Sequence, residues 1–146
     1  VFDNLGYIKH CFNCGERNFS NIYSTDLCPI CNSKFHVAGQ LWTGKLFDKS
    51  IISNLIKNYF SGNFNNDKKN HHIKQIFDIS IEELDDMPYY FSVDEIASKL
   101  KTSPKKLSQI IEKVICSGYR ASRTIFRPTG LKTNASMSDL LCILKN

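Results

Sequence analysis

Apolar residues recur at helical spacing through much of the chain beyond residue 48. A helix is predicted over 48–60, where apolar side chains return every three or four positions and Asp48 can cap the first turn. A second amphipathic helix is predicted from Ile73, with an acidic outer face that includes Glu83. Residues 61–72 between them are polar, rich in asparagine and without a period, so we expect a flexible insertion there.

Two short helices joined by a tight turn are predicted next. Ser92 followed three residues later by Glu95 is a capping box, which opens the first of them. Ser103 and Pro104 are the residue types of an N-cap and a first helical position, so the second helix is predicted to begin there. Gly118 ends it. The pair has the form of a helix-turn-helix.

A hairpin is predicted after these helices. Residues 119–126 have the pattern of a strand, 127–130 that of a turn and 131–133 that of a return segment, and a last helix is expected from about Ser136. The resulting order of helix, strand, helix, helix, strand and turn is the plan of a winged-helix domain.

The chemistry of the chain is concentrated before this helical part, in two CxxC knuckles. Thirteen residues separate the second cysteine of the first knuckle from the first cysteine of the second. Two intervening residues let both thiolates turn to one side of a tight loop, and two facing loops make a tetrahedral sulfur cage for one zinc ion. Gly15 and Asn32, one after each knuckle, tolerate the left-handed backbone that such loops need. The predicted ligands are Cys11, Cys14, Cys28 and Cys31.

Other readings of the cysteines remain open at this point. The four thiols could pair as disulfides, stay reduced without a ligand, or hold iron instead of zinc. A full four-cysteine cage leaves no open coordination position, so the ion would stabilise the fold and activate no water. His10 and His36 are interpreted as ordinary loop residues. Cys116 and Cys142 lie in apolar helical patterns and are predicted to pack in the core.

Composition narrows the class of protein. The chain has 146 residues, of which 42% are hydrophobic, enough for a core in one domain or two small ones. Its sequence has no apolar run of the roughly 18 residues that a membrane helix needs, so we expect a soluble intracellular protein that uses no membrane. Because the first residue is Val, we expect the chain to be a fragment of a longer protein.

Charge is distributed unevenly. The formal net charge is +5, but residues 73–94 carry a net charge of −5 and residues 95–134 a net charge of +7. A change of that size within sixty residues suggests a surface that faces a polyanion, held beside an acidic one.

Five segments together resemble the C-terminal half of the tRNA (guanine-26 N2)-dimethyltransferases, the Trm family. They are residues 6–11 (GYIKHC), 39–48 (GQLWTGKLFD), 88–90 (PYY), 118–124 (GYRASRT) and 128–133 (PTGLKT), in addition to the two knuckles. The resemblance spans nearly the whole chain in the right order, except for residues 61–72. The chain departs from the family at Gln40 and Lys45, where the family has proline, and at Ile125, where it has histidine.

The resemblance implies a function. Enzymes of this family use S-adenosylmethionine to methylate the exocyclic amine of guanosine 26 in tRNA, and their catalytic half precedes the region matched here. This sequence has no glycine-rich cofactor loop followed by an acidic ribose ligand. We therefore expect the chain to be inactive alone, with no catalytic residue of its own, and to hold tRNA for an N-terminal catalytic domain of the same protein.

The basic half contains the expected RNA contacts. A wing and a helix N-terminus can place cations along a phosphate backbone. The candidates are Lys105, Lys106, Arg120, Arg123, Arg127 and Lys132. Arg123 could instead pair with acids of the catalytic half. The family motif further comprises Ser122, Thr124, Pro128, Gly130, Thr133 and Trp42, and Trp42 is interpreted as a core or domain-interface anchor.

The predicted fold class is α+β, with three parts. A four-cysteine zinc-ribbon-like subdomain covers 1–47, a helix with its flexible insertion covers 48–72, and a helix-rich, winged-helix-like basic domain covers 73–146. A DNA-binding module with a zinc ribbon and a winged helix is the alternative, although the predicted recognition helix offers few side chains suited to base edges. A ubiquitin-ligase RING is excluded, since it needs two metal sites and four ligands make one.

Overall fold

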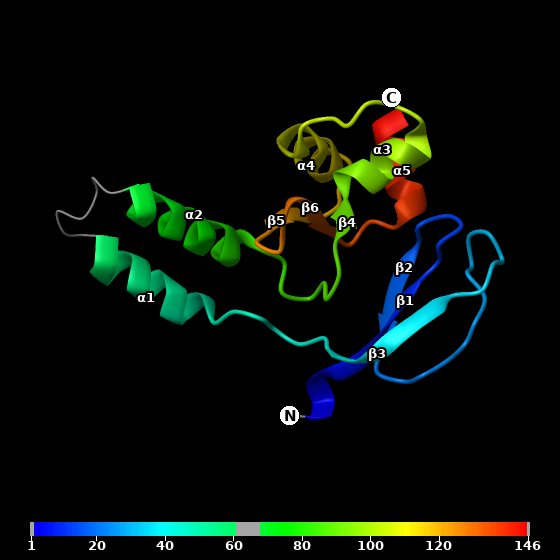
Figure 1. Ribbon diagram of the computed structural model, residues 1–146, viewed down its shortest axis with the longest axis horizontal. Coiled ribbons are helices and arrows are strands. Elements are labelled where there is room, and N and C mark those ends of the chain that lie inside the picture. Colours follow the sequence, from blue (N-terminus) through cyan, green and yellow to red (C-terminus); the bar gives the residue numbers. More distant parts are fainter. Residues whose placement is uncertain (1, 61–67, 146) are drawn as a thin grey trace.

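The described part of the chain, residues 2–60 and 68–145 of this computed structural model, has a mixed α/β arrangement (Figure 1). Residues 61–67 of the predicted insertion lie outside the described residues. The strands are β1 (Leu5–His10), β2 (Arg17–Ser20), β3 (His36–Trp42), β4 (Phe91–Ser92), β5 (Ala121–Thr124) and β6 (Arg127–Thr133). The helices are a short 3-10 turn (Phe2–Asn4), α1 (Lys49–Phe60), α2 (Lys68–Glu82), α3 (Val93–Leu100), α4 (Leu107–Cys116) and α5 (Met137–Lys145).

The first sheet carries the two knuckles. Its strands are antiparallel in the order β2-β1-β3, and Ile8 in the central strand lies opposite Phe19 on one side and Ala38 on the other. The first knuckle follows directly from β1, and the second lies between β2 and β3. The sheet therefore brings both knuckles to one end.

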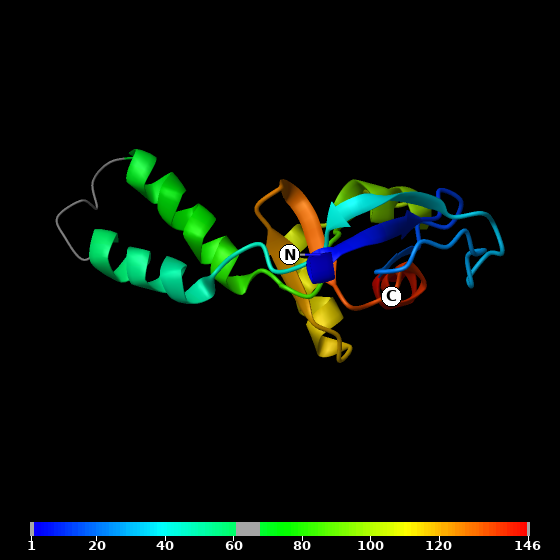
Figure 2. The same cartoon turned by 90° about the horizontal axis from the view of Figure 1, so that it is seen from below.

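Helices α1 and α2 lie side by side and form an arm that projects away from the sheets (Figure 2). Asp48 caps α1 as predicted, because its Oδ1 accepts the backbone N–H groups of Ser50 at 2.9 Å and Ile51 at 3.2 Å. Helix α2 begins at Lys68, so residues 68–72 are helical and do not belong to a flexible insertion. Most of residues 68–72 are polar, so the spacing of apolar residues did not predict that this segment is helical.

The second sheet, in the order β4-β6-β5, supports the main hydrophobic core together with α3, α4 and α5. Helix α4 buries Leu107, Ile110 and Val114, which lie on one side of the helix. Ile115 was predicted to be buried with them but is 52% exposed. The core cluster consists of Phe91, Val93, Ile96, Leu107, Ile110, Val114, Leu131, Ala135, Met137, Leu140 and Leu144. All of it belongs to the C-terminal part of the chain.

The start of α4 differs from the prediction. The helix begins at Leu107 with Lys106 as its N-cap, so Ser103 and Pro104 precede it in a segment without regular secondary structure. The Lys105 ammonium donates to the Leu144 carbonyl at the end of α5, at 3.1 Å, and ties this segment to that helix. Lys105 and Lys106 therefore do not occupy a first helical turn.

Cys116 and Cys142 are exposed, contrary to the expectation that they pack in the core. Helix α4 buries Val114, and α5 buries Leu140 and Leu144. A residue two positions from a buried one points to a different side of a helix. Both thiols consequently face outward.

Within the described residues, the helices are all too short or too polar to cross a membrane.

Candidate metal centre and arginine hairpin

The four cysteine sulfur atoms of the knuckles converge on one point. They all lie within 4.8 Å of one another, with Cys11 Sγ 3.4 Å from Cys31 Sγ and Cys14 Sγ 3.5 Å from Cys28 Sγ. Tetrahedral Zn–S bonds of about 2.3 Å place sulfur atoms roughly 3.7 Å apart, so the arrangement fits one such ion. All four are free thiols, which does not agree with the disulfide alternative.

Both knuckles have the same backbone. In the first, the Cys11 N–H donates to the Glu16 carbonyl and the Gly15 N–H donates back to the Cys11 carbonyl. In the second, Cys28 and Asn32 make the equivalent bonds. Gly15 and Asn32 have φ values of 86° and 57°, which confirms the predicted left-handed positions.

The environments of the thiols differ. Burial raises the pKa of Cys14 to about 12, whereas hydrogen bonds from Ser33 and Asn13 lower the pKa of Cys31 to about 5. A divalent cation at the centre of the cage would favour the thiolate form of all four sulfurs.

The histidines that flank the knuckles lie outside this cluster. The sulfur atoms alone form the described group that could hold a metal. His10 Nε2 lies 3.5 Å from Glu95 Oε1, and burial, followed by the charge of Arg17, lowers the pKa of His10. The His36 ring packs against Phe12, with centroids 4.4 Å apart. Neither imidazole replaces a thiolate.

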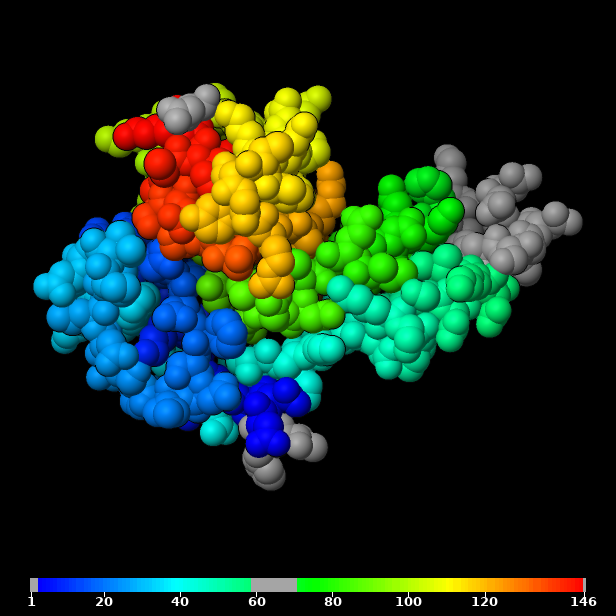
Figure 3. All heavy atoms as spheres, turned by 180° about the vertical axis from the view of Figure 1, so that it is seen from behind, coloured from blue at the N-terminus to red at the C-terminus, as the bar shows by residue number. Residues whose placement is uncertain are grey.

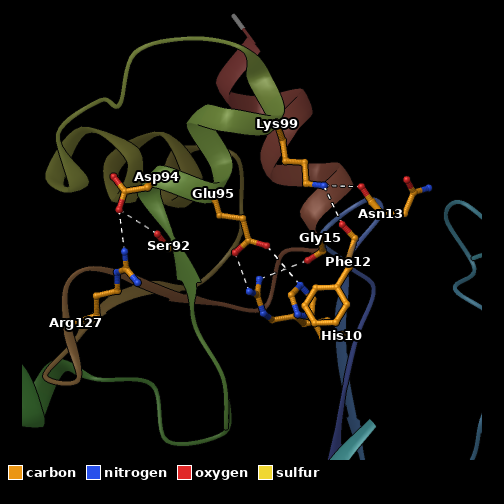
Figure 4. A network of polar contacts seen from close by, with 10 residues as sticks. His10, Phe12, Asn13, Gly15, Ser92, Asp94, Glu95, Lys99 and Arg127 are labelled. Carbon is orange, nitrogen blue, oxygen red and sulfur yellow. Dashed lines mark hydrogen bonds and ion pairs between the residues drawn. The ribbon is translucent and has the colours of Figure 1, made fainter. Parts of the chain in front are cut away.

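The first knuckle docks on α3 and α5 (Figure 4). Arg17 donates to Glu95 at 2.7 Å, and the Glu16 carboxylate accepts the Met137 backbone N–H at 2.8 Å. Lys99 donates to backbone carbonyls of the knuckle. Glu95 therefore does not complete the predicted capping box, because its charge is satisfied by Arg17, and Ser92 is the N-cap without a side-chain capping bond.

The predicted RNA-contacting cations have different environments. Arg120 pairs with Asp86, and Arg127 pairs with Asp94 at 2.9 Å; both arginines are about half exposed. Lys106 is exposed at the N-cap of α4. Arg123 points outward from β5, and its side chain makes no ion pair or hydrogen bond with the described residues. The hairpin is thus at the surface.

Among the predicted RNA-contacting cations, Lys132 is buried. Its side chain is only 4% exposed, and its ammonium lies 2.7 Å from Glu83 Oε1. Its position does not agree with an RNA contact. Glu83 itself is buried and follows the end of α2, so it is not on the outer face of that helix. Its carboxylate also accepts Thr124 Oγ1 at 2.9 Å and the Ile125 N–H at 3.0 Å. Sequence reasoning missed this network.

Most of the other family-motif residues are structural here. Ser122 Oγ accepts the Leu84 N–H at 3.0 Å, and Thr133 Oγ1 accepts the Ala135 N–H at 3.0 Å. A Cβ added at Gly130 would lie 2.5 Å from the methyl group of Thr124, so the close approach of β5 and β6 requires glycine. Pro128 lies beside it in β6. Ser122, Thr133 and Gly130 thus fix the hairpin from inside, whereas Pro128 is exposed.

Trp42 lies at the end of β3. It is 44% exposed, and its Nε1 donates to the Lys45 carbonyl at 3.2 Å. It is therefore not part of a core formed by the described residues.

Comparison with known proteins identifies the relatives of this chain. A family model described as N2,N2-dimethylguanosine tRNA methyltransferase matches residues 1–145. The tRNA (guanine(26)-N(2))-dimethyltransferase of Methanosphaera stadtmanae is 33% identical over 143 residues, which cover 96% of this chain and 36% of that protein. The protein of the same name from Methanobrevibacter smithii is 34% identical over 145 residues, which cover 97% of this chain and 37% of that protein.

A solved structure agrees with these matches. The complex of Trm1 from Pyrococcus horikoshii with S-adenosyl-L-methionine aligns with 99% of this chain and 36% of that chain, with a TM-score of 0.76 and 27% sequence identity. The chain thus spans little more than a third of the length of its relatives.

Proposed function

Because the chain belongs to the N2,N2-dimethylguanosine tRNA methyltransferase family, we propose that it is the C-terminal tRNA-binding region of an enzyme that dimethylates guanine 26 of tRNA inside the cell. The remaining length of such an enzyme would contain the catalytic domain. That domain would bind S-adenosylmethionine, which supplies the methyl groups. This chain has no cofactor loop of its own, so in this proposal it positions the substrate and is inactive alone.

The four cysteines are proposed to hold a structural zinc ion. Four thiolates complete a tetrahedral shell and leave no position for water or substrate. The ion would therefore fix the knuckles, and the first knuckle would in turn hold Arg17 and Glu16 against α3 and α5. The zinc-ribbon-like description of residues 1–47 rests on this proposal.

The basic part is proposed to be a winged-helix-like domain over 73–146. In support, α3 and α4 lie in sequence between β4 and the β5–β6 hairpin, and β6 lies between the other two strands. The hairpin would be the wing. RNA helices have a deep, narrow major groove that a helix cannot read, so contacts to shape, phosphates and 2′-hydroxyls are expected.

The observation that carries the RNA-binding role is the orientation of the Ser-Arg-Thr segment. Ser122 and Thr124 are buried and hydrogen-bonded to Leu84 and Glu83, the two residues directly after α2, whereas Arg123 between them is exposed. Alternation along β5 thus fixes two residues inside and presents the third to solvent.

A competition experiment tests this function. Filter binding of labelled folded tRNA is measured against unlabelled folded tRNA, unfolded tRNA and duplex DNA over a salt series. We expect folded tRNA to compete best, and the affinity to fall with salt as counterions are released. Better competition by duplex DNA would overturn the proposal and favour a DNA-binding module.

A further inference from the structure

A cavity of about 460 Å³ lies between α2 and the β5–β6 hairpin. In the space-filling view, the hairpin (orange) lies against α2 (green) on this face (Figure 3). The volume is in the roughly 300–1,000 Å³ range of small-molecule sites. Its lining includes Gln75, Ile76, Asp78, Glu82, Arg123 and Ile125.

The charged groups of the cavity are unpaired. Arg123, Asp78 and Glu82 line the same space, yet none of their side chains forms an ion pair or hydrogen bond with residues 2–60 or 68–145. The neighbouring Arg120 and Arg127, by contrast, are each neutralised by an aspartate. The cavity therefore offers one charged donor and two charged acceptors to a ligand, beside the polar side chains of His72 and Gln75.

The position of Arg123 is fixed by its neighbours. Thr124 donates to the buried Glu83 at 2.9 Å, and the N–H of Ile125 donates to the same carboxylate at 3.0 Å. Ser122 accepts the Leu84 N–H on the other side of Arg123. The backbone that carries the guanidinium is therefore ordered before a ligand binds.

The charges decide which ligand fits. A phosphate would be attracted by Arg123 and repelled by Asp78 and Glu82, so the cavity is poorly suited to an anion. A neutral ring that presents N–H donors on one edge and acceptors on the next would satisfy all three groups. Guanine has this arrangement, because N1–H and N2–H₂ face carboxylates well and O6 and N7 accept from arginine. Ile76 and Ile125 provide apolar surface for the ring.

We propose that this cavity binds an unpaired guanine base of the substrate RNA. The inference rests on the proposed function and adds to it a base-specific contact.

Neutralising the carboxylates gives the sharpest test. Asp78→Asn and Glu82→Gln make the surface more positive, so they would strengthen tRNA binding if the cavity only approached phosphates. If the carboxylates accept hydrogen bonds from guanine, each substitution weakens tRNA binding by about tenfold, as does Arg123→Gln. Glu112→Gln, on the exposed side of α4, removes the same charge away from the cavity and is the matched control.

A titration with free nucleosides separates the base from the phosphate. The Arg123 Nε–H resonance of the protein is followed by NMR while guanosine, adenosine, cytidine or uridine is added. Saturable binding of guanosine, at least about tenfold tighter than that of the others and lost in the three cavity variants, would support the site. An unchanged spectrum with guanosine would overturn it.

The remaining outcomes separate this inference from the proposed function. If the protein prefers folded tRNA but the cavity variants bind it as tightly as the wild type or more tightly, the base site is wrong and the tRNA-binding role stands. If the cavity variants lose thermal stability while their tRNA affinity is unchanged, the three side chains stabilise the fold and the base site is wrong. If the protein does not prefer folded tRNA, both fall.

Discussion

Among single residues, burial separates the structural charges of the hairpin from those that face solvent. Arg123 and Lys132 lie on adjacent strands, and both belong to the basic motif. Lys132 points inward, where the Glu83 carboxylate and the Leu84 carbonyl receive its ammonium at 2.7 and 3.3 Å. Arg123 points outward. Strand alternation thus gives two similar cations opposite orientations.

The Glu83–Lys132 pair should be one of the most sensitive positions of the chain. Glu83→Gln removes the charge that compensates the buried ammonium, so the free energy of unfolding should fall by about 3–5 kcal/mol. Urea denaturation measures it. Asp78→Asn, at an exposed position of the preceding helix α2, should change stability by less than about 0.5 kcal/mol. The double variant Glu83→Gln/Lys132→Met should recover part of the loss. If Glu83→Gln and Asp78→Asn changed the free energy of unfolding equally, the Glu83–Lys132 pair would not be needed for stability.

Asp139 should make the stability depend on pH. It forms a reciprocal cap at the start of α5, because its carboxylate accepts from Ser136 Oγ at 2.7 Å and its N–H donates back to that hydroxyl at 3.1 Å. The hydrogen bond from Ser136 holds the pKa of Asp139 below its ordinary value of 3.8. A lowered folded-state pKa adds stability that is fully present above 3.8 and is lost as the pH falls through the folded-state value.

The variant Asp139→Ala should therefore lose about 1 kcal/mol of stability at neutral pH. The difference from the wild type should shrink in acid, as measured by thermal unfolding from about pH 7 to pH 2.5. Ser136→Ala removes the main donor and should reproduce most of the loss. A difference that is the same at both ends of the range would contradict the assigned cap.

At the scale of elements, the first knuckle and α3 are joined by a pair that is much less exposed than a typical surface ion pair. The side chains of Arg17 and Glu95 are 15% and 22% exposed, whereas those of Arg127 and Asp94 are 46% and 56% exposed. Arg17 also lies over the Phe91 ring, 4.9 Å from its centroid. The Arg17–Glu95 pair should therefore contribute more to the free energy of unfolding than the Arg127–Asp94 pair.

Two double-mutant cycles compare the pairs. The cycle of Arg17→Ala and Glu95→Ala should give a coupling energy of about 1.5–3 kcal/mol, in the range of charged hydrogen bonds. The cycle of Arg127→Ala and Asp94→Ala, measured in the same denaturant series, should give about 0–1 kcal/mol because solvent screens that pair. Similar coupling energies in both cycles would mean that the first knuckle is held by other contacts.

The sequence predicted features that depend on near neighbours. The grouping of the four cysteines, the left-handed Gly15 and Asn32 and the Asp48 cap all follow from local sequence patterns. The resemblance to the family is likewise a matter of ordered local motifs, and the comparisons confirm it.

The features that were missed depend on distant partners. Glu83 is buried by Thr124, 41 residues away, and Glu95 turns to Arg17, 78 residues away. In the sequence, a buried acidic residue such as Glu83 cannot be told from its exposed acidic neighbours unless its partner is known. The helical residues 68–72 were missed for another reason, since they carry no apolar stripe. Burial of charges and the cavity at Arg123 therefore required the structure.

At the scale of the whole molecule, the two sheets differ in what supports them. The core cluster lies entirely within residues 91–144. In the first sheet and its knuckles, residues 3–47, the buried side chains are those of Cys11, Cys28, Lys9 and Glu16, and none is a large apolar residue. A unit without an apolar core needs another source of stability, and a structural metal commonly provides it.

Removal of the ion should therefore unfold one part before the other. Metal analysis should first find one zinc ion per chain. After chelation, hydrogen exchange should show lost protection in β1, β2 and β3, while the amides of α4 and of the centre of α5 stay protected by the apolar core. The N-terminal turn of α5 should also exchange faster, because the Met137 N–H loses the Glu16 carboxylate when the knuckle opens. Uniform loss of protection would mean that the molecule unfolds as one unit, and unchanged exchange in β1–β3 would mean that the ion does not support the first sheet.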